Sequence, residues 1–196
     1  MRRHRQALAF AIIASTLLLL PLGLRAAEPP NAAALVAAQR QAMQPLSILD
    51  GRWRGPATVT LPDGRRVETT QTERAGSLLG GSIKVIEGRG YGADGTVTFG
   101  AFGVISFAPQ TGRYNFRSYA QGFAGDFPME VRADGFSWTI KAGPATLRYT
   151  ATIRDGVWTV IGERLVEGAP PVRTFEMTLQ RIGDTDWPDG GAVPAK

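Results

Sequence analysis

The chain has 196 residues, with 22 Lys and Arg, 17 Asp and Glu, a formal net charge of +5, one histidine and no cysteine. The missing cysteine excludes disulfides, thiol nucleophiles and cysteine-bound metals. The single histidine is His4, so the rest of the chain also excludes a Ser-His-Asp triad and haem ligation by histidine.

The first segment, residues 1–26, has the layout of a secretory signal peptide. A basic start precedes an apolar run from Ala7 to Leu24, which Pro21 interrupts near its end, and small residues follow at Ala26 and Ala27. We expect cleavage after Ala26, with an uncleaved membrane anchor as the alternative.

Cleavage at this point changes the charge argument. Residues 1–26 carry four arginines and no acidic residue, so their removal lowers the formal net charge from +5 to +1. Such a balance gives no support for a nucleic-acid partner. Without a cysteine for lipid attachment, we expect a periplasmic or secreted protein with no stable membrane association, no metal and no cofactor.

Residues 27–46 are predicted to form a linker and a short helix. Pro29 and Pro30 bar a helix at the start of this segment, and the Ala, Gln and Arg content that follows favours a helix over residues 32–43. Pro45 is expected to end that helix.

Residues 47–183 have the pattern of an all-β domain. Runs such as "FSWTIK" and "LRYTATIR" alternate apolar and polar residues, which is typical of antiparallel strands with one buried face. Asp-Gly pairs recur between the runs, for example at Asp63-Gly64 and Asp155-Gly156, and favour tight hairpins. We predict an up-and-down antiparallel barrel of about eight to ten strands, followed by a flexible tail over residues 184–196.

Two motifs match known ligand sites only superficially. Gly90 to Gly95, "GYGADG", fits the dinucleotide fingerprint, but a strand pattern follows it instead of the helix that would bind phosphate. Asp184 to Gly190, "DTDWPDG", clusters three acids without the glycine and glutamate positions of a calcium loop. We interpret the first as a hairpin and the second as a solvated segment.

Ligand contacts are expected on the strands. Arg117, Tyr119, Arg148 and Glu163 lie on presumed strands, and inside a barrel they would contact an acidic or amphipathic ligand. The alternative is that the arginines lie on the solvent side. Glu73, Asp126, Glu130 and Glu163 are the carboxylates considered for acid–base chemistry, but they form no recognisable catalytic constellation, so no catalytic residue is assigned.

The stretch "LDGRWRG", Leu49 to Gly55, resembles the G-x-W opening of lipocalin-like (calycin) barrels. Most of residues 47–182 resembles a bacterial domain of unknown function, family 1579, whose members are expected to be lipocalin-like barrels. The resemblance includes Gly80-Gly81 and the segment from Phe107 to Tyr114, where Ala108 replaces the aspartate of the family pattern.

The resemblance implies a closing assembly at one end of the barrel. In calycin barrels the tryptophan of this motif plugs one end, and an arginine from the last strand packs across it. The corresponding residues are Gly51, Trp53 and Arg181, and we expect Trp53 and Arg181 to be in contact through a cation–π interaction.

These patterns predict an exported, non-enzymatic barrel that binds a small apolar or amphipathic molecule in its interior. The alternative is a structural or interaction module of the cell envelope with a filled core. An enzyme that uses Glu, Tyr and Arg groups in the barrel is a third, weaker hypothesis.

Overall fold

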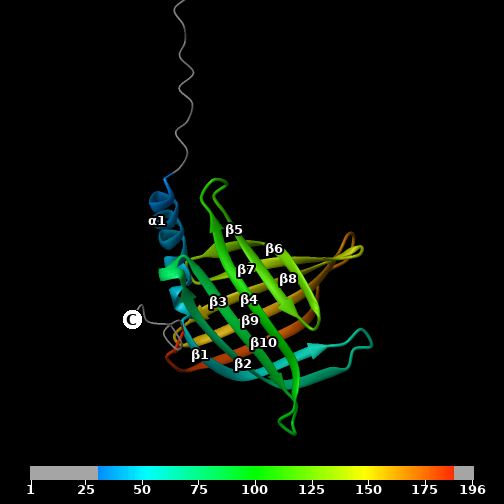
Figure 1. Ribbon diagram of the computed structural model, residues 1–196. Helices are drawn as coiled ribbons and strands as arrows, with labels where there is room; N and C mark the ends of the chain where they lie inside the picture. Colours follow the sequence, from blue (N-terminus) through cyan, green and yellow to red (C-terminus); the bar gives the residue numbers. More distant parts are fainter. Residues whose placement is uncertain (1–30, 188–196) are drawn as a thin grey trace, which may run out of the picture.

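Ten antiparallel strands close into a barrel, and one helix lies against one end of it (Figure 1). The computed structural model describes residues 31–187. The strands follow an up-and-down order, and β1 pairs with β10 to close the sheet. The predicted fold class is confirmed. The elements are α1 (Ala32–Met43), a 3₁₀ helix (Gln44–Leu49), β1 (Gly51–Thr60), β2 (Arg66–Leu78), a short 3₁₀ turn (Leu79–Gly81), β3 (Ile83–Tyr91), β4 (Val97–Ala108), β5 (Arg113–Ala120), β6 (Phe123–Arg132), β7 (Gly135–Ala142), β8 (Ala145–Arg154), β9 (Val157–Val166) and β10 (Val172–Gly183).

The predicted Asp-Gly turns lie between the strands. Asp155 and Gly156 join β8 to β9 with φ angles of 51° and 72°. Two consecutive residues with positive φ form the turn whose twist matches a two-residue hairpin, and Asp-Gly tolerates that conformation.

Helix α1 begins and ends where local chemistry requires. The Asn31 side chain accepts a hydrogen bond from the Ala33 backbone N–H at 2.9 Å and caps the first turn. After Met43 the chain continues as a 3₁₀ helix with Pro45 near its start, as expected for a proline that interrupts an α-helix. The Tyr114 hydroxyl on β5 donates to the Ala42 carbonyl at 2.6 Å, which holds the helix against the barrel.

The two ends of the barrel are built differently. At the helix end, Met43, Leu46 and Leu49 insert into the barrel and are 3%, 0% and 0% exposed. The strand connections 79–82, 109–112, 133–134 and 155–156 lie at this end, together with the helix. The connections 61–65, 92–96, 121–122, 143–144 and 167–171 lie at the opposite end, called the open end below.

The helix end also contains an ion pair with a buried ammonium group. Lys84 on β3 is 1% exposed, and its register partner on β4 is the core residue Ile105, so its side chain faces inward. Its ammonium group pairs with the Asp50 carboxylate and donates to the Ser77 hydroxyl at 2.7 Å. These partners offset the desolvation of the charge.

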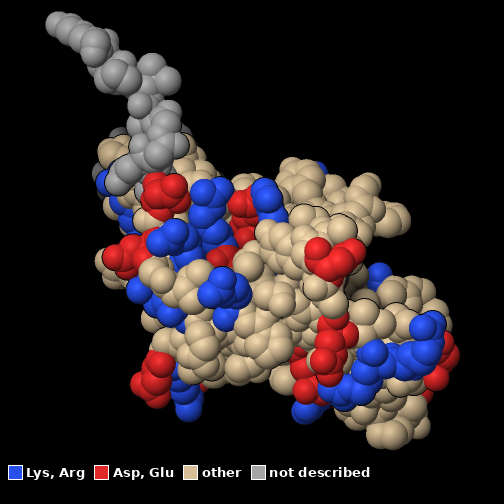
Figure 2. All heavy atoms as spheres, turned by 90° about the horizontal axis from the view of Figure 1, so that it is seen from below, with Lys and Arg blue, Asp and Glu red and all other residues tan. Residues whose placement is uncertain are grey.

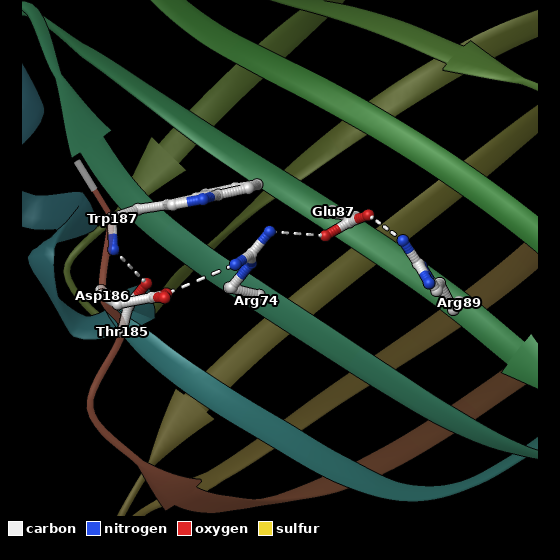
Figure 3. A network of polar contacts seen from close by, with 6 residues as sticks. All are labelled: Arg74, Glu87, Arg89, Thr185, Asp186 and Trp187. Atoms are coloured by element: carbon white, nitrogen blue, oxygen red, sulfur yellow. Dashed lines mark hydrogen bonds and ion pairs between the residues drawn. The ribbon is translucent and has the colours of Figure 1, made fainter. Parts of the chain in front are cut away.

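The segment after β10 packs against the outside of the barrel, in contrast to the predicted flexible tail over residues 184–196. The Arg74 guanidinium lies 3.9 Å from the centroid of the Trp187 ring and also pairs with Asp186 at 3.3 Å (Figure 3). We call residues 184–187 the strap. Gly76 on β2 makes room for it, because a Cβ on Gly76 would lie 2.8 Å from the Trp187 Cβ. The prediction is therefore wrong for residues 184–187, while residues 188–196 lie outside the described part.

Among residues 31–187, no helix has the length and apolar character needed to cross a membrane. The predicted signal peptide over residues 1–26 lies outside the described residues. On the face shown in Figure 2, basic and acidic side chains lie next to one another.

Candidate functional site

The predicted closing assembly lies at the helix end. Trp53 and Arg181 are register partners on β1 and β10, and Trp53 is 1% exposed. The Trp53 indole N–H donates to the Leu49 carbonyl at 2.9 Å, and its ring meets Trp158 edge to face with centroids 5.7 Å apart. These contacts make Trp53 part of the packed plug.

Arg181 acts on the backbone instead of the indole. Its guanidinium donates to the Asp50 carbonyl at 3.2 and 3.3 Å and pairs with Asp184 at 2.6 Å. A Cβ on Gly51 would lie 2.9 Å from Arg181 Nε, so glycine is needed for this approach. Within residues 31–187, the cation–π contacts involve other pairs, and the expected guanidinium–indole stacking of Arg181 and Trp53 is not among them.

The interior face changes character towards the open end. On β3 to β6 several inward-facing positions carry small residues, and the rings of Phe116 and Phe127 lie over two of them, Gly103 and Gly125. On β7 to β10 a group of inward-facing positions carries aromatic residues. We call the first set the small-residue wall; its members are Gly88, Gly90, Ala101, Gly103, Ser118, Ala120 and Gly125. We call the second set the aromatic wall; its members are Trp138, Tyr149 and Phe175.

The aromatic wall is ordered by ring contacts. Trp138 and Tyr149 stack with centroids 4.9 Å apart and an interplanar angle of 11°, and Tyr149 meets Phe175 edge to face at 6.2 Å. All three residues face inward yet are only partly buried. A solvent-accessible space therefore reaches the aromatic wall, whereas the helix-end core is closed.

A polar pair on β2 lies on the same interior face. Glu73 is the register partner of Trp53, which places its side chain inside the barrel. The Gln71 amide, in a residue 5% exposed, donates to Glu73 Oε1 at 2.8 Å. A Cβ on Gly88 would lie 2.6 Å from Glu73 Oε1, and one on Gly90 would lie 3.2 Å from Gln71 Oε1. The two glycines of β3 therefore leave the space that these side chains occupy.

The Glu73 carboxyl is electrostatically unusual. Its pKa is raised to about 7, chiefly because burial disfavours the charged form; the hydrogen bond from Gln71 opposes the shift, and the nearby Glu87 charge adds to it. Within residues 31–187, no ion pair involves Glu73. The interior thus holds a carboxyl whose charge state changes near neutral pH.

The open rim is apolar. Large hydrophobic side chains remain exposed there, the most extreme being Phe123 at 82%. Register and alternation place the rim residues on the interior side of their strands. They are Val59, Val67, Phe99, Phe123 and Val172. An apolar rim above a partly solvated interior is the arrangement expected of an entrance for apolar molecules.

Two open hollows lie in the wall. One, of about 470 Å³, is at the rim and is lined by residues 100–102 and 119–124. The other, of about 730 Å³, lies at the seam between β6 and β7, with Trp138 and Met129 among its lining.

The seam between β6 and β7 has only four register pairs, from Met129–Trp138 to Arg132–Gly135. Pairing stops at Pro128, which has no N–H to donate to β7.

The ligand contacts expected from sequence lie on the outer face, so their predicted interior placement is wrong. Arg117 and Tyr119 alternate with the buried Phe116, and Arg117 pairs with Asp126 while its Nε donates to the Tyr119 hydroxyl at 2.8 Å. The cause is the register of β5, which places the odd-numbered positions of this segment outside.

Arg148 and Glu163 are also on the outer face. They are register partners and form an ion pair at 2.8 Å, with side chains 44% and 26% exposed. Arg148 lines the seam hollow from outside. Of the adjacent pair on β9, it is Arg164 that shares the interior side, since its partner Leu147 alternates with the inward-facing Tyr149.

Sequence reasoning considered Glu73 among several acids and did not connect it with Gln71, Gly88 and Gly90. A signal was present, because Gln71, Glu73 and Ala75 share one face of a strand and two glycines recur at a spacing of two. Within residues 31–187, no three His, Cys, Asp or Glu side chains gather closely enough to hold a metal ion.

The architecture defines the class of protein as a closed ten-stranded antiparallel β-barrel with one plugged end. No protein-family model matches the chain, and no curated protein matches it. Among solved structures, the crystal structure of Rv2717c from M. tuberculosis is similar, with a TM-score of 0.55 and 16% sequence identity. The match covers 71% of this chain and 96% of that one. At this identity the likeness supports the shared fold alone.

Proposed function

We propose that this protein is an exported carrier that binds a small apolar or amphipathic molecule inside the open half of its barrel. The observation that carries the proposal is the aromatic wall, which faces inward but remains partly solvent-accessible below a rim of exposed apolar side chains. Sites for small molecules are mostly apolar, with a few polar groups that orient the ligand, and here Gln71 and Glu73 supply such groups.

The resemblance of residues 47–182 to family 1579 and the signal-like layout of residues 1–26 support the exported, lipocalin-like part of the proposal. Mass spectrometry of the protein from the periplasmic fraction tests the export: we expect an N-terminus at Ala27. Recovery of the uncleaved chain in the membrane fraction would favour an anchor instead.

Binding is tested by blocking the interior. Ala101→Phe on β4 adds bulk to the small-residue wall. Thr178→Phe adds the same ring to the outer face of β10, at an exposed position between the inward-facing Met177 and Leu179. With an anilinonaphthalene probe or a fluorescent fatty alcohol, we expect saturable binding to the natural protein and to Thr178→Phe. Binding to Ala101→Phe should be weaker by roughly tenfold or more, because the added ring occupies ligand space.

Equal affinity for both variants would place the probe outside the barrel. Absence of saturable binding to the natural protein would contradict the carrier function and favour a structural or interaction module of the cell envelope. Circular dichroism of both variants confirms that any loss of binding is not a loss of fold.

A further inference from the structure

Three charged side chains on the interior face, Lys84, Glu73 and Arg164, differ in whether they have an oppositely charged partner. Lys84, deep at the helix end, already has Asp50 and Ser77. Arg164 lies at the exposed open rim. Glu73 lies between these two levels, and within the described residues it has one hydrogen-bond partner, the amide of Gln71. The interior between the plug and the rim therefore has a carboxylate that no described cation balances.

The groups around Glu73 hold its carboxylate in one orientation. Gln71 is 5% exposed, and its side-chain amide donates a hydrogen bond to Glu73 Oε1. The other carboxylate oxygen, Glu73 Oε2, has no hydrogen-bond partner among residues 31–187. Gly88 allows the carboxylate to lie flat against β3. An oriented carboxylate with a free oxygen is a hydrogen-bond acceptor for a ligand.

The rest of the compartment suits the same ligand. Trp138, Tyr149 and Phe175 present aromatic surfaces to the interior, and the Tyr149 hydroxyl has no hydrogen-bond partner among residues 31–187. Aromatic faces attract organic cations, whereas they give no such attraction to anions. The arginines that would have favoured an anion, Arg117 and Arg148, point away from the barrel.

We propose that the barrel selects amphipathic organic cations, with a protonated amine bound at the free oxygen of Glu73 and an apolar body against the aromatic wall. This inference rests on the proposed carrier function and names the chemical class of its ligand. It reverses the polarity that the scattered arginines suggested, from an acidic ligand to a basic one.

Selection by Glu73 depends on pH. The groups facing it are Trp53 on β1, Gln71 on its own strand and the glycines of β3, none of which titrates near neutrality. The charge that acts on its carboxyl is that of Glu87, on the outer face of β3, where it pairs with Arg74 and Arg89. Lys84, on the interior face of β3, is paired with Asp50. Ionisation of Glu73 therefore controls cation binding, and affinity should rise as the pH increases through about 7.

The experiment compares three probes with one ring system: 1-naphthylmethylamine, 1-naphthalenemethanol and 1-naphthoate. Binding is followed by tryptophan quenching and by calorimetry at about pH 6 and about pH 8, on either side of the Glu73 pKa. At the higher pH we expect the amine to bind roughly tenfold to a hundredfold more tightly than the alcohol, and the carboxylate most weakly.

Three variants identify the group responsible. Glu73→Gln should remove the preference for the amine and its pH dependence while alcohol binding is retained. Gly88→Ala, which keeps the charge but displaces the carboxylate, should reduce amine binding only. Glu163→Gln makes the same acid-to-amide change on the outer face and should behave like the natural protein.

The outcomes separate this inference from the carrier function. Alcohol binding without a preference for the amine, or an amine preference that survives in Glu73→Gln, would overturn the cation selectivity and leave the carrier function standing. No binding of any probe to the natural protein would overturn both. Unfolding curves in which Glu73→Gln is at least as stable as Glu163→Gln at both pH values exclude a folding defect as the cause.

Discussion

The helix end and the open end of this barrel use the same strands for opposite purposes. At the helix end, Leu49, Trp53 and Leu179 are at most 1% exposed and fill the interior. Towards the open end, Trp138 and Tyr149 face inward but retain accessible surface. The comparison shows that side chains pack tightly and bury apolar surface at one end, whereas the other end leaves interior aromatic surface accessible. The proposed carrier function assigns that accessible surface to a ligand.

The largest expected effect tests this difference directly. Trp53→Ala should lower the free energy of unfolding by about 3–5 kcal/mol, because it empties a packed site and leaves the Leu49 carbonyl without its donor. Trp138→Ala should cost clearly less, because its ring is partly solvated. Urea unfolding of both variants provides the measurement, and equal losses would show that the two ends do not differ in packing.

The next effect concerns the buried charge at the helix end. Asp50→Ala removes the counter-ion of Lys84, which is 1% exposed, and should cost about 2–3 kcal/mol because an unpaired ammonium remains buried. Lys84→Met removes the charge itself and should cost less. Thermal unfolding of the two single variants and the double variant measures this; a double variant no more stable than Asp50→Ala would contradict the explanation.

The third prediction uses the interior Glu73 carboxyl. Its folded pKa of about 7 lies above the unfolded value of 4.5, so the folded state binds the proton more tightly. The associated stability is present below about pH 4.5 and is lost as the pH rises towards 7, by about 1–3 kcal/mol. Urea unfolding across this range should show the loss in the natural protein and in Glu163→Gln, but not in Glu73→Gln.

The smallest effect concerns the strap outside the barrel. Trp187→Ala removes the ring that lies over Arg74 and against Phe102, and should lower the free energy of unfolding by about 1 kcal/mol. Asp186→Asn, in which the affected side chain is 71% exposed, should change stability by less. Thermal melting with ligand titration checks both, and a larger effect on binding than on stability would connect the strap with the open end.

The regular features of the fold were predictable because they depend on local chemistry. Alternation in residues 136–141 and 147–154 predicts strands, and Asp-Gly pairs predict the turns between them. The role of Trp53 as a plug followed from the G-x-W resemblance. The flexible tail was mispredicted for residues 184–187, because the partners of Trp187, Arg74 on β2 and Phe102 on β4, are distant in the sequence.

The candidate site was less predictable, because it depends on which face of each strand is inside. Alternation places Glu163 and Arg164 on opposite faces but does not say which of them faces the interior. The register of β8 with β9 assigns Arg164 to the interior side and pairs Glu163 with Arg148 outside. In the same way, the register of β4 with β5 places Arg117 and Tyr119 on the outer face, whereas an interior placement was expected from the sequence.

The sequence by itself therefore determined the strands and the turns between them, since period-two alternation and turn chemistry are local properties. The plugged end was implied by the G-x-W resemblance. Only the tertiary structure decided what the interior contains. Closure of β1 on β10 and the pairing of β2 with β3 bring Glu73 over Gly88, and burial then raises its pKa. A long-range register sets this environment, and no single stretch of sequence encodes it.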